Sequence, residues 1–435
     1  MTSSDSQPVA GQATANQPIA IISAPGSRGD VNPMVAIGCE LKRHGFRVII
    51  SLAENYAAVA QHAGLEPHAL ITKAQFDLLT SDPRVWTPVH GIRAILRDAA
   101  CAFLEPHFKL IQQHHQPGRT VLVAHPLDLA SRIYRDIDPS TPLASVHLAP
   151  AMVRDFANPP RLTSWQTKRP PPALLTKAAY FLADHWVGDR WLAEPINQLR
   201  RRFGLKDVSR VLEQWWLSPD LVLALYPDWF ANVRPPVQGR WVSCGFPIPL
   251  DDREHDGGLG SAEAPVFVTP GTAHRHAQRL LGDVMTACEM IERRCIVATS
   301  FAEQLPASLP SYVTAKGYVS LNQTLRECSA IVHHGGIGTT AMSMFTGCPQ
   351  LICPMAFDQF HNADRVKSLG IGDIYEPRTW TSPKQKLKRL ASLLASLTSN
   401  AETRTACQQL AARVDSFRGA ENASNEIVDL LHSHA

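Results

Sequence analysis

The sequence contains no apolar run that approaches the roughly 20 residues of a membrane-spanning helix. Its first 17 residues, MTSSDSQPVAGQATANQ, also lack the apolar core of a secretion signal. We therefore expect residues 1–17 to form a disordered polar lead, and we expect the protein to be cytoplasmic.

A strong charge of one sign is absent as well. The 42 Lys and Arg residues nearly balance the 39 Asp and Glu residues, so the formal net charge is +3. No long basic tract with interleaved aromatic residues is present, which makes nucleic acid a poor candidate for a partner. The balance still permits one local positive pocket for a phosphate group.

Cysteine pairs with metal-ligand or redox spacing are also missing. The nine Cys residues include no C-x-x-C pair, and several fall in apolar segments, such as Cys39, Cys295 and Cys353. This usage is typical of reduced, buried thiols in a cytosolic protein rather than of a disulfide framework.

What the chain does contain is a long alternation of short apolar segments and helical segments. Its 435 residues, 45% of them hydrophobic, are too many for one ordinary core and indicate two domains. Asn32–Gly45 is predicted to be a helix with Pro in its first turn and Gly at its end. Five short, continuously apolar segments of the first half are predicted to be buried strands: Pro18–Ala24, Phe46–Leu52, Thr120–His125, Pro142–Leu148 and Leu221–Tyr226.

The alternation restarts after residues 249–264, which are polar, Gly-rich and acidic, as expected of a linker. A long helix is predicted near His274–Arg294, and further helices close the chain from about Pro383. The strands predicted for this half are Val266–Gly271, Cys295–Ser300, Tyr312–Val319, Ala330–His334 and Gln350–Met355.

Unbroken apolar strands separated by helices predict parallel sheets that are covered on both faces. The predicted fold class is therefore α/β, with two Rossmann-like doubly wound domains, residues 18–248 and 265–415, that face a cleft. Residues 416–435 are expected to form a terminal helix that packs back on the first domain.

A glycine-rich turn, HHGGIGTTA, follows the strand predicted to end at His334. Gly permits a close backbone approach to a ligand, and a helix N-terminus offers unpaired N–H groups, so a phosphate group fits such a turn. A weaker signal of the same kind, TPGT, places Gly271 and Thr272 ahead of the next predicted helix. The candidates in the first turn are His334, Gly335, Gly336, Gly338 and Thr339.

The same stretch also fits a dinucleotide site. Residues 336–341, GIGTTA, satisfy the G-x-G-x-x-A variant of the dinucleotide fingerprint, and Asp358 lies about 20 residues further on, where an acid would bind a ribose. Against a nicotinamide cofactor, Gln359 follows the acid directly and gives the pair a dense set of hydrogen-bond donors and acceptors. A tight turn without any ligand is the third alternative.

Another glycine turn, PGSRGD, follows the first predicted strand of the chain. Gly26 and Gly29 bracket Ser27 and Arg28, and Asp30 comes just before the predicted helix. Asp30 is then either a helix cap or a carboxylate at the carboxyl edge of a parallel sheet, where ligands bind.

Together these motifs resemble those of the GT-B glycosyltransferases of family 1, which use nucleotide-activated sugars. The segment HGGIGTTAMSMFTGCPQLICPMAFDQFHNADRV matches that family's donor motif closely. GSRGDVNPM resembles its N-terminal Gly loop, in the version that carries Asp where plant members usually carry His. The similarity covers nearly the whole chain from Pro18. A narrower resemblance, to the rhamnosyltransferases of rhamnolipid synthesis, rests on SDPRVWTP, EPINQLRRRFGL, PDWF, GFP and DQFHNADRV.

The resemblance implies a role for each matching residue. His334 would contact the donor diphosphate, and Asp358 and Gln359 would bond hydroxyl groups of the donor sugar. Asp30 would be the catalytic base, across the cleft from the leaving group. The other donor-binding residues would be Gly271, Thr272, Gly335, Gly336, Gly338 and Thr339, with Tyr318 and Val319 beside the nucleobase, where YVSLNQ replaces the family's aromatic–x–Pro–Gln run.

The resemblance also implies a direct displacement with inversion at the anomeric carbon, without a metal ion or cofactor. The donor would be dTDP-L-rhamnose and the acceptor a 3-(3-hydroxyalkanoyloxy)alkanoic acid, so the product would be a mono-rhamnolipid. The alternative is UDP-glucose as donor, or a sterol, polyketide or other apolar natural product as acceptor. A nicotinamide-dependent oxidoreductase is a more distant alternative.

A lipid product would bring loose association with the inner membrane or with a lipid-precursor synthase. The middle of the first predicted domain is rich in Trp, Phe and Leu, and Trp215 and Trp216 cannot both face one side of a helix. These side chains either line an apolar acceptor site or pack in the core. DID, at Asp136–Asp138, matches the D-x-D motif of metal-dependent glycosyltransferases only formally, so no metal site is expected.

Overall fold

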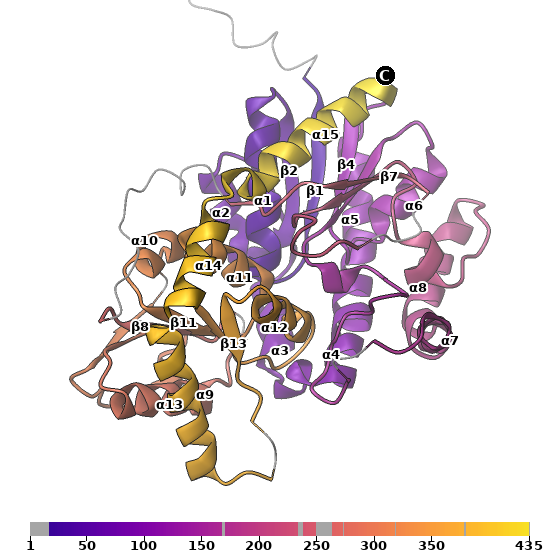
Figure 1. Ribbon diagram of the computed structural model, residues 1–435. Helices are drawn as coiled ribbons and strands as arrows, with labels where there is room; N and C mark the ends of the chain where they lie inside the picture. Colours follow the sequence, from indigo (N-terminus) through magenta and orange to yellow (C-terminus); the bar gives the residue numbers. More distant parts are fainter. Residues whose placement is uncertain are drawn as a thin grey trace, which may run out of the picture.

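The computed structural model describes residues 17–167, 170–233, 238–248, 263–272, 274–317, 319–377 and 380–434, which form two parallel β-sheets with their helices (Figure 1). The first sheet has the strand order β3-β2-β1-β4-β5-β6-β7, and every neighbouring pair in it is parallel. Its strands are β1 Ile19–Ala24, β2 Arg47–Ala53, β3 Glu66–Ile71, β4 Thr120–Ala124, β5 Leu143–His147, β6 Leu221–Ala224 and β7 Arg240–Ser243.

The second sheet repeats this winding with the order β10-β9-β8-β11-β12-β13, again all parallel. In each sheet the chain starts at a central strand, moves to one edge and then returns to fill the other side, which is the doubly wound pattern. The strands are β8 Val266–Thr269, β9 Cys295–Ala298, β10 Val313–Lys316, β11 Ala330–His333, β12 Gln350–Ile352 and β13 Gly372–Ile374.

Helices connect these strands in chain order. Those of the first half are α1 Arg28–Arg43, α2 Ala57–His62, α3 Lys73–Ser81, α4 Pro88–Arg93, α5 Cys101–His114, α6 Ala130–Ile137, α7 Ala173–Ala183 and α8 Asp189–Arg202. Those of the second half are α9 Gln278–Met290, α10 Leu321–Arg326, α11 Ile337–Thr346, α12 Gln359–Ser368, α13 Pro383–Ser399, α14 Ala401–Ala411 and α15 Gly419–His434. Short 3₁₀ or π turns include η2 Pro83–Trp86, η5 Asp184–Gly188 and η6 Val211–Trp215.

Alternate residues of β1 show that helices cover both faces of the first sheet. Ala20 and Ile22 pack with residues of α1, α2 and α15, whereas Ile19 and Ile21 pack with residues of α5, α6 and α8. Successive strand residues point to opposite faces, so a strand that is apolar throughout must be buried on both. The predicted α/β, doubly wound architecture is confirmed.

Three strands were not predicted from the sequence, because they lie at sheet edges, where burial is incomplete. β3, β7 and β13 occupy edge positions, and β3 and β7 contain no fully buried residue. An edge strand needs no continuous apolar run, so its sequence carries a weaker signal.

The predicted start of the first helix was wrong by four residues. α1 begins at Arg28, because Ser27 is its N-cap and Asp30 completes a capping box with Ser27. Pro33 therefore lies inside the helix rather than in its first turn. The predicted long helix near His274–Arg294 is likewise shorter, since α9 begins at Gln278.

The chain crosses back to the first domain at its end. In Figure 1, α15 lies along α1 and the first sheet, and Ala423, Ile427 and Leu431 join the core there. Just before this helix, Phe417 stacks on Phe246 at a centroid distance of 5.9 Å, and the N–H of Phe246 donates to the carbonyl oxygen of Ser416 over 2.7 Å.

Ion pairs join the two halves near the carboxyl edges of their sheets. The Arg161 guanidinium contacts Asp364 at 2.6 and 2.9 Å and Glu376 at 2.7 Å, and Arg275 contacts Asp77 at 2.7 Å. Within the described ranges, no helix combines the length and apolar character needed to span a membrane.

Candidate active site

His334 is held between two glycine turns that follow adjacent strands. β11 and β8 are neighbours, and their last residues, His333 and Thr269, are paired in register. A Cβ atom on Gly271 would lie 2.6 Å from His334 Cε1, and one on Gly336 would lie 2.5 Å from His334 Nε2. Both distances are too short for real atoms, so the imidazole occupies its place only because both residues lack a side chain.

The environment of His334 keeps its ring neutral. Burial lowers the pKa of His334 to about 3, and the neighbouring His333 and His274 lower it further. Its Nδ1 is buried and has no hydrogen-bond partner within the described residues. A neutral ring with an unpartnered buried nitrogen is suited to a ligand that supplies the missing partner.

His333, by contrast, is engaged within the protein. The N–H of Gly335 donates to His333 Nδ1 over 3.1 Å, so the proton of the neutral ring is on Nε2, which donates to Gln350 Oε1 over 3.0 Å. The two histidines thus separate into one that fixes the turn and one that faces outward from it.

The turn leads into the N-terminus of α11, which has no side-chain cap. Gly336 is the N-cap, and the first turn contains no acidic residue. The first N–H groups of this ten-residue helix therefore lack intrahelical acceptors, and such a group of donors suits an anion. Thr339 lies in this turn, and Gly338 and Thr272 are exposed nearby in the fold.

Asp30 lies at the opposite carboxyl edge, that of the first sheet. Its Oδ2 accepts hydrogen bonds from the N–H of Ser27 over 2.8 Å and from Ser27 Oγ over 3.1 Å. Gly26 has a φ of +136°, and any Cβ there would collide with the Asp30 carboxylate. The two interpretations of Asp30 are thus compatible, because the carboxylate caps α1 and is still about one quarter exposed.

His125 is a partner of Asp30 that the sequence did not reveal. It directly follows β4, the neighbour of β1, and its Nε2 lies 3.3 Å from Asp30 Oδ1. The N–H of Leu127 donates to His125 Nδ1 over 3.2 Å, so Nε2 carries the proton and donates to Asp30. The available signal was a polar residue at the end of a central buried strand, which is where parallel sheets place functional groups.

Asp358 brings a second carboxylate close to Asp30. Burial raises the pKa of Asp358 to about 6, the hydrogen bond from Asn362 Nδ2 over 2.7 Å opposes this, and the charge of Asp30 raises it again. Asn362 Nδ2 also donates to the carbonyl oxygen of Gly335 over 2.9 Å, so it links Asp358 to the glycine turn at His334. The adjacent Gln359 uses Oε1 to accept from the N–H groups of Met355 and Ala356 over 2.8 and 3.1 Å, which fixes the loop before α12.

An aromatic contact between the domains lies beside these residues. Trp86, from η2 of the first domain, packs against His274 at a centroid distance of 4.7 Å and against Phe357 at 6.1 Å. Trp86 Nε1 and His274 Nδ1 are buried without hydrogen-bond partners within the described residues. Phe357, which precedes Asp358, has a positive φ of 56°, a strained conformation of the kind found at ligand sites. Nothing in the sequence pattern identified this contact.

The remaining candidates fall into separate places. Arg28 and Gly29 are the first two residues of α1. Val319 packs against the small core cluster that contains Phe267. Tyr318 lies outside the described residues. The structure thus brings together the two glycine turns, His334 and Asp358, while Asp30 lies at the carboxyl edge of the other sheet.

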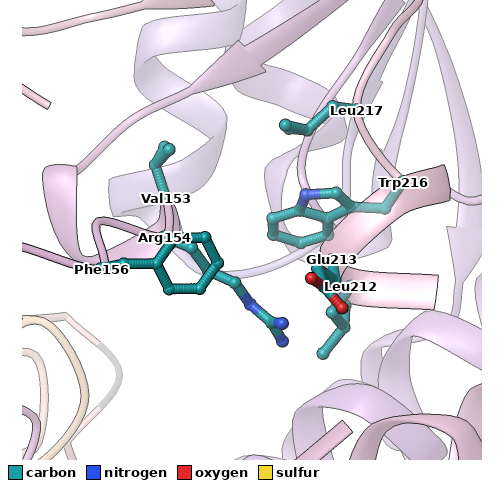
Figure 2. A pocket seen from close by; sticks show the side chains of 7 residues that line it. All are labelled: Val153, Arg154, Phe156, Leu212, Glu213, Trp216 and Leu217. Atoms are coloured by element: carbon teal, nitrogen blue, oxygen red, sulfur yellow. The ribbon is translucent and has the colours of Figure 1, made fainter. Parts of the chain in front are cut away.

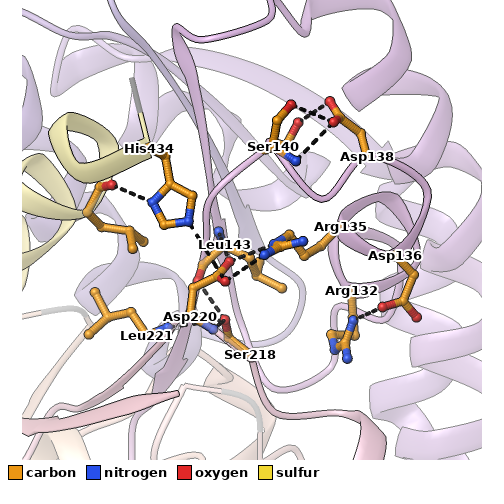
Figure 3. Close-up of polar contacts among 12 residues, drawn as sticks. Arg132, Arg135, Asp136, Asp138, Ser140, Leu143, Ser218, Asp220, Leu221 and His434 are labelled. Carbon is orange, nitrogen blue, oxygen red and sulfur yellow. Dashed lines mark hydrogen bonds and ion pairs between the residues drawn. The ribbon is translucent and has the colours of Figure 1, made fainter. Parts of the chain in front are cut away.

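The DID motif is part of the scaffold. Asp136 accepts from Arg132, and Asp138 caps the turn at Ser140 (Figure 3). Asp136 also accepts from Arg200 and from Trp215 Nε1, the latter over 2.8 Å. Across the described ranges, no group of three His, Cys, Asp or Glu side chains is arranged to hold a metal ion.

A small pocket opens in the first domain (Figure 2). Trp216 forms one wall and packs edge-on against His147 at 5.4 Å, and His147 ends β5, next to the strand that leads to His125. Trp215 instead packs in the core under Arg132 and Arg200, so the two tryptophans point to different surroundings, as predicted. The pocket is lined by Val153, Arg154, Phe156, Leu212, Glu213, Trp216 and Leu217.

Comparison with known proteins identifies the class of enzyme to which these residues belong. Residues 283–431 match the family model of the erythromycin biosynthesis protein CIII-like C-terminal domain. The chain is 26% identical over 421 residues to O-mycaminosyltylonolide 6-deoxyallosyltransferase of Streptomyces fradiae, which covers 92% of this chain and 94% of the relative.

Two solved structures share the fold across almost the full length. The glycotransferase of kitacinnamycin is 19% identical with a TM-score of 0.66, covering 95% of this chain and 99% of that one. The spinosyn rhamnosyltransferase SpnG complexed with thymidine diphosphate is 18% identical with a TM-score of 0.63, covering 95% and 100%.

The chain is therefore a glycosyltransferase with the GT-B fold. This confirms the predicted fold and enzyme class, and it replaces the oxidoreductase alternative. The narrower likeness to rhamnolipid rhamnosyltransferases stays a prediction.

The packing of His334 can be tested with Gly271→Ala. Gly271 has a φ of +90°, and the added methyl group would collide with the imidazole. We expect the free energy of unfolding to fall by about 1–3 kcal/mol, with loss of turnover, measured by denaturant titration and a transfer assay. The matched control is Gly282→Ala, in α9, where nothing lies within 4 Å of the new Cβ. It should be neutral or stabilise by up to about 1 kcal/mol. Equal stability of the two variants would show that the imidazole does not depend on this glycine.

Proposed function

We propose that the chain transfers L-rhamnose from dTDP-L-rhamnose to the hydroxyl group of a 3-(3-hydroxyalkanoyloxy)alkanoic acid, which yields a mono-rhamnolipid. The observation that carries the proposal is the glycine turn that holds His334, to which Asn362 links the carboxylate of Asp358. Asp30, at the carboxyl edge of the other sheet, is the nearby acid whose charge raises the pKa of Asp358. This arrangement supplies a base, a sugar-binding carboxylate and an anion site, one for each part of the reaction.

The donor side belongs to the second domain in this proposal. The diphosphate lies against the N-terminus of α11, where His334 and the hydroxyl groups of Thr272 and Thr339 donate to its oxygens and Gly335, Gly336 and Gly338 permit close approach. Asp358 accepts from sugar hydroxyl groups, with Gln359 beside it. A 6-deoxyhexose on thymidine diphosphate is supported by the relative named for a 6-deoxyallosyl transfer and by the neighbour named as a rhamnosyltransferase with thymidine diphosphate.

The acceptor side belongs to the first domain. Asp30 removes the proton of the acceptor hydroxyl as its oxygen attacks the anomeric carbon, while the bond from that carbon to the diphosphate breaks and the configuration inverts. His125 is a positioning residue that holds the Asp30 carboxylate through Nε2. The developing charge on the leaving diphosphate is stabilised by the helix N-terminus and by His334, so the reaction needs no metal ion.

The acceptor is proposed to enter through the pocket at Trp216, whose walls include Val153, Phe156 and Leu217. Apolar walls suit a fatty acyl chain. They also suit a second candidate acceptor, an apolar natural product of the polyketide type, which the names of the tylonolide and spinosyn relatives favour. UDP-glucose is retained as the alternative donor.

A donor and acceptor panel tests this function. Purified protein with EDTA is given a β-hydroxy fatty-acid dimer or a macrolide aglycone, each with dTDP-L-rhamnose, dTDP-glucose or UDP-glucose, and products are read by mass spectrometry. A deoxyhexose adduct on the fatty-acid dimer from dTDP-L-rhamnose supports the proposal. An adduct on the macrolide alone would favour the second candidate acceptor over the fatty-acid dimer. A hexose adduct would show that the donor sugar is glucose and not rhamnose.

The roles of Asp30 and His125 separate in their variants. Asp30→Asn should lower kcat by about 10²–10⁴ because the base is lost, with little change in the KM for the donor. His125→Gln keeps a donor at the position of Nε2 and should retain much more activity than His125→Phe. Full turnover of Asp30→Asn, or equal loss in both His125 variants, would contradict these roles.

The pKa of Asp358 predicts how donor binding depends on pH. Its carboxyl group has a pKa raised to about 6, so it is ionised above that pH and protonated below it. The ionised form accepts sugar hydroxyl bonds, so we expect donor affinity to fall about tenfold between pH 7 and pH 5. Asp358→Asn should bind more weakly at pH 7 and show a flat profile, measured by calorimetric titration. An unchanged pH profile in this variant would assign the dependence to another group.

A further inference from the structure

Helix α7 lies at the periphery of the protein and exposes an apolar surface (Figure 1). It contains one charged residue, Lys177, and only Thr176 is buried, with Tyr180 partly buried. In Figure 1 this helix lies at the periphery of the molecule, beside α8. The large apolar residues exposed on it and on the following turn are Leu174, Leu175, Phe181, Leu182 and Trp186, with exposed fractions of 54–79%, and we call them the α7 face.

The α7 face follows helical spacing. Phe181 follows Leu174 by seven residues, and Leu182 follows Leu175 by seven. Two turns of a helix span about seven residues, so these four side chains lie on one side of α7. The opposite side carries the attachment to the domain, through Tyr180 packed edge-on against Phe156 at 5.9 Å. The apolar side is thus presented outward as one surface, rather than as scattered residues.

Within residues 173–190, the exposed charged side chains are basic. Lys177 and Arg190 are exposed, whereas the two acidic residues of the same stretch are turned inward. Asp184 is almost fully buried in an ion pair with Arg154, and Asp189 accepts from the N–H groups of Arg210 and Val211. An apolar surface with a basic border is complementary to an anionic lipid headgroup layer over acyl chains.

The inward side of α7, opposite the α7 face, adjoins the pocket at Trp216. Phe156 and Arg154 line that pocket, and both contact Tyr180 of α7, Arg154 at 4.9 Å from the ring centroid. Lys177 in turn lies 5.4 Å from the ring centroid of Phe156. One wall therefore separates the exposed apolar surface from the proposed acceptor pocket.

We propose that the α7 face docks the enzyme on an anionic lipid bilayer, with α7 lying in the interface and the pocket beside it. Trp186 lies at the level of the headgroups, and Lys177 and Arg190 contact their phosphates. If the docked enzyme takes its acceptor from the bilayer, that step rests on the lipid acceptor of the proposed function. The docking itself does not depend on the identity of the acceptor.

Vesicle flotation tests the docking without any substrate. The full chain should float with phosphatidylcholine vesicles that contain phosphatidylglycerol, and binding should fall in phosphatidylcholine alone and in high salt. Leu174→Ser with Phe181→Ser should abolish most of the binding. Lys177→Glu with Arg190→Glu should weaken it by at least about fivefold for each charge. Leu78→Ser, which removes a side chain 77% exposed on α3, is the control and should bind as the wild type does.

Two outcomes would overturn the docking. One is absence of flotation with anionic vesicles. The other is sedimentation of the wild type as a dimer that the Leu174 and Phe181 changes dissociate, since the α7 face would then bind a second copy of the chain.

Activity separates this proposal from the proposed function. On a short-chain acceptor that dissolves without vesicles, the α7 variants should turn over at the wild-type rate. Vesicle binding with no transfer to any lipid acceptor would refute the acceptor and retain the docking. Loss of transfer to the dissolved acceptor in the α7 variants would show that the face serves catalysis and not docking.

Discussion

The arrangement of the candidate active site depends on one steric condition, the absence of side chains at Gly271 and Gly336 on either side of the His334 ring. Two adjacent parallel strands end at this point, and their turns can approach each other only because neither glycine carries a Cβ. The surroundings of the ring lower the pKa of His334, so it stays neutral, with the first turn of α11 beside it. An anion at this position would contact the neutral His334 ring and the partial positive charge of the α11 N-terminus, and the first turn of α11 carries no acidic side chain that would repel it.

The second constraint is the relation between the two domains. Asp30 and Asp358 belong to different sheets, so their approach requires the carboxyl edges of both sheets to face each other. Arg161 bonds Asp364 of α12 and Glu376, which follows β13, and the terminal helix returns to complete the core of the first domain. In the proposed reaction, these contacts determine whether base and donor meet at the right distance.

Much of this could be predicted from the sequence because the signals are local. Continuous apolar strands, as at Ile19–Ala24 and Ala330–His333, follow from burial on both faces, and the glycine turns follow directly after them. The contacts of His125 and Trp86 could not be predicted, because each depends on which strands and domains become neighbours. The capping box of Ser27 and Asp30 was a local signal, but the interior Pro33, three residues after Asp30, obscured the start of the helix.

The most direct test of the anion site is calorimetric titration of thymidine diphosphate into the wild type and His334→Ala, with phosphate-free thymidine as the control ligand. If His334 donates to the diphosphate, its loss should weaken thymidine diphosphate by about 10–100-fold, as expected for one hydrogen bond to a charged group. Thymidine should bind both proteins equally. Equal affinity of the two proteins for thymidine diphosphate would contradict the assignment of this turn to the donor phosphates.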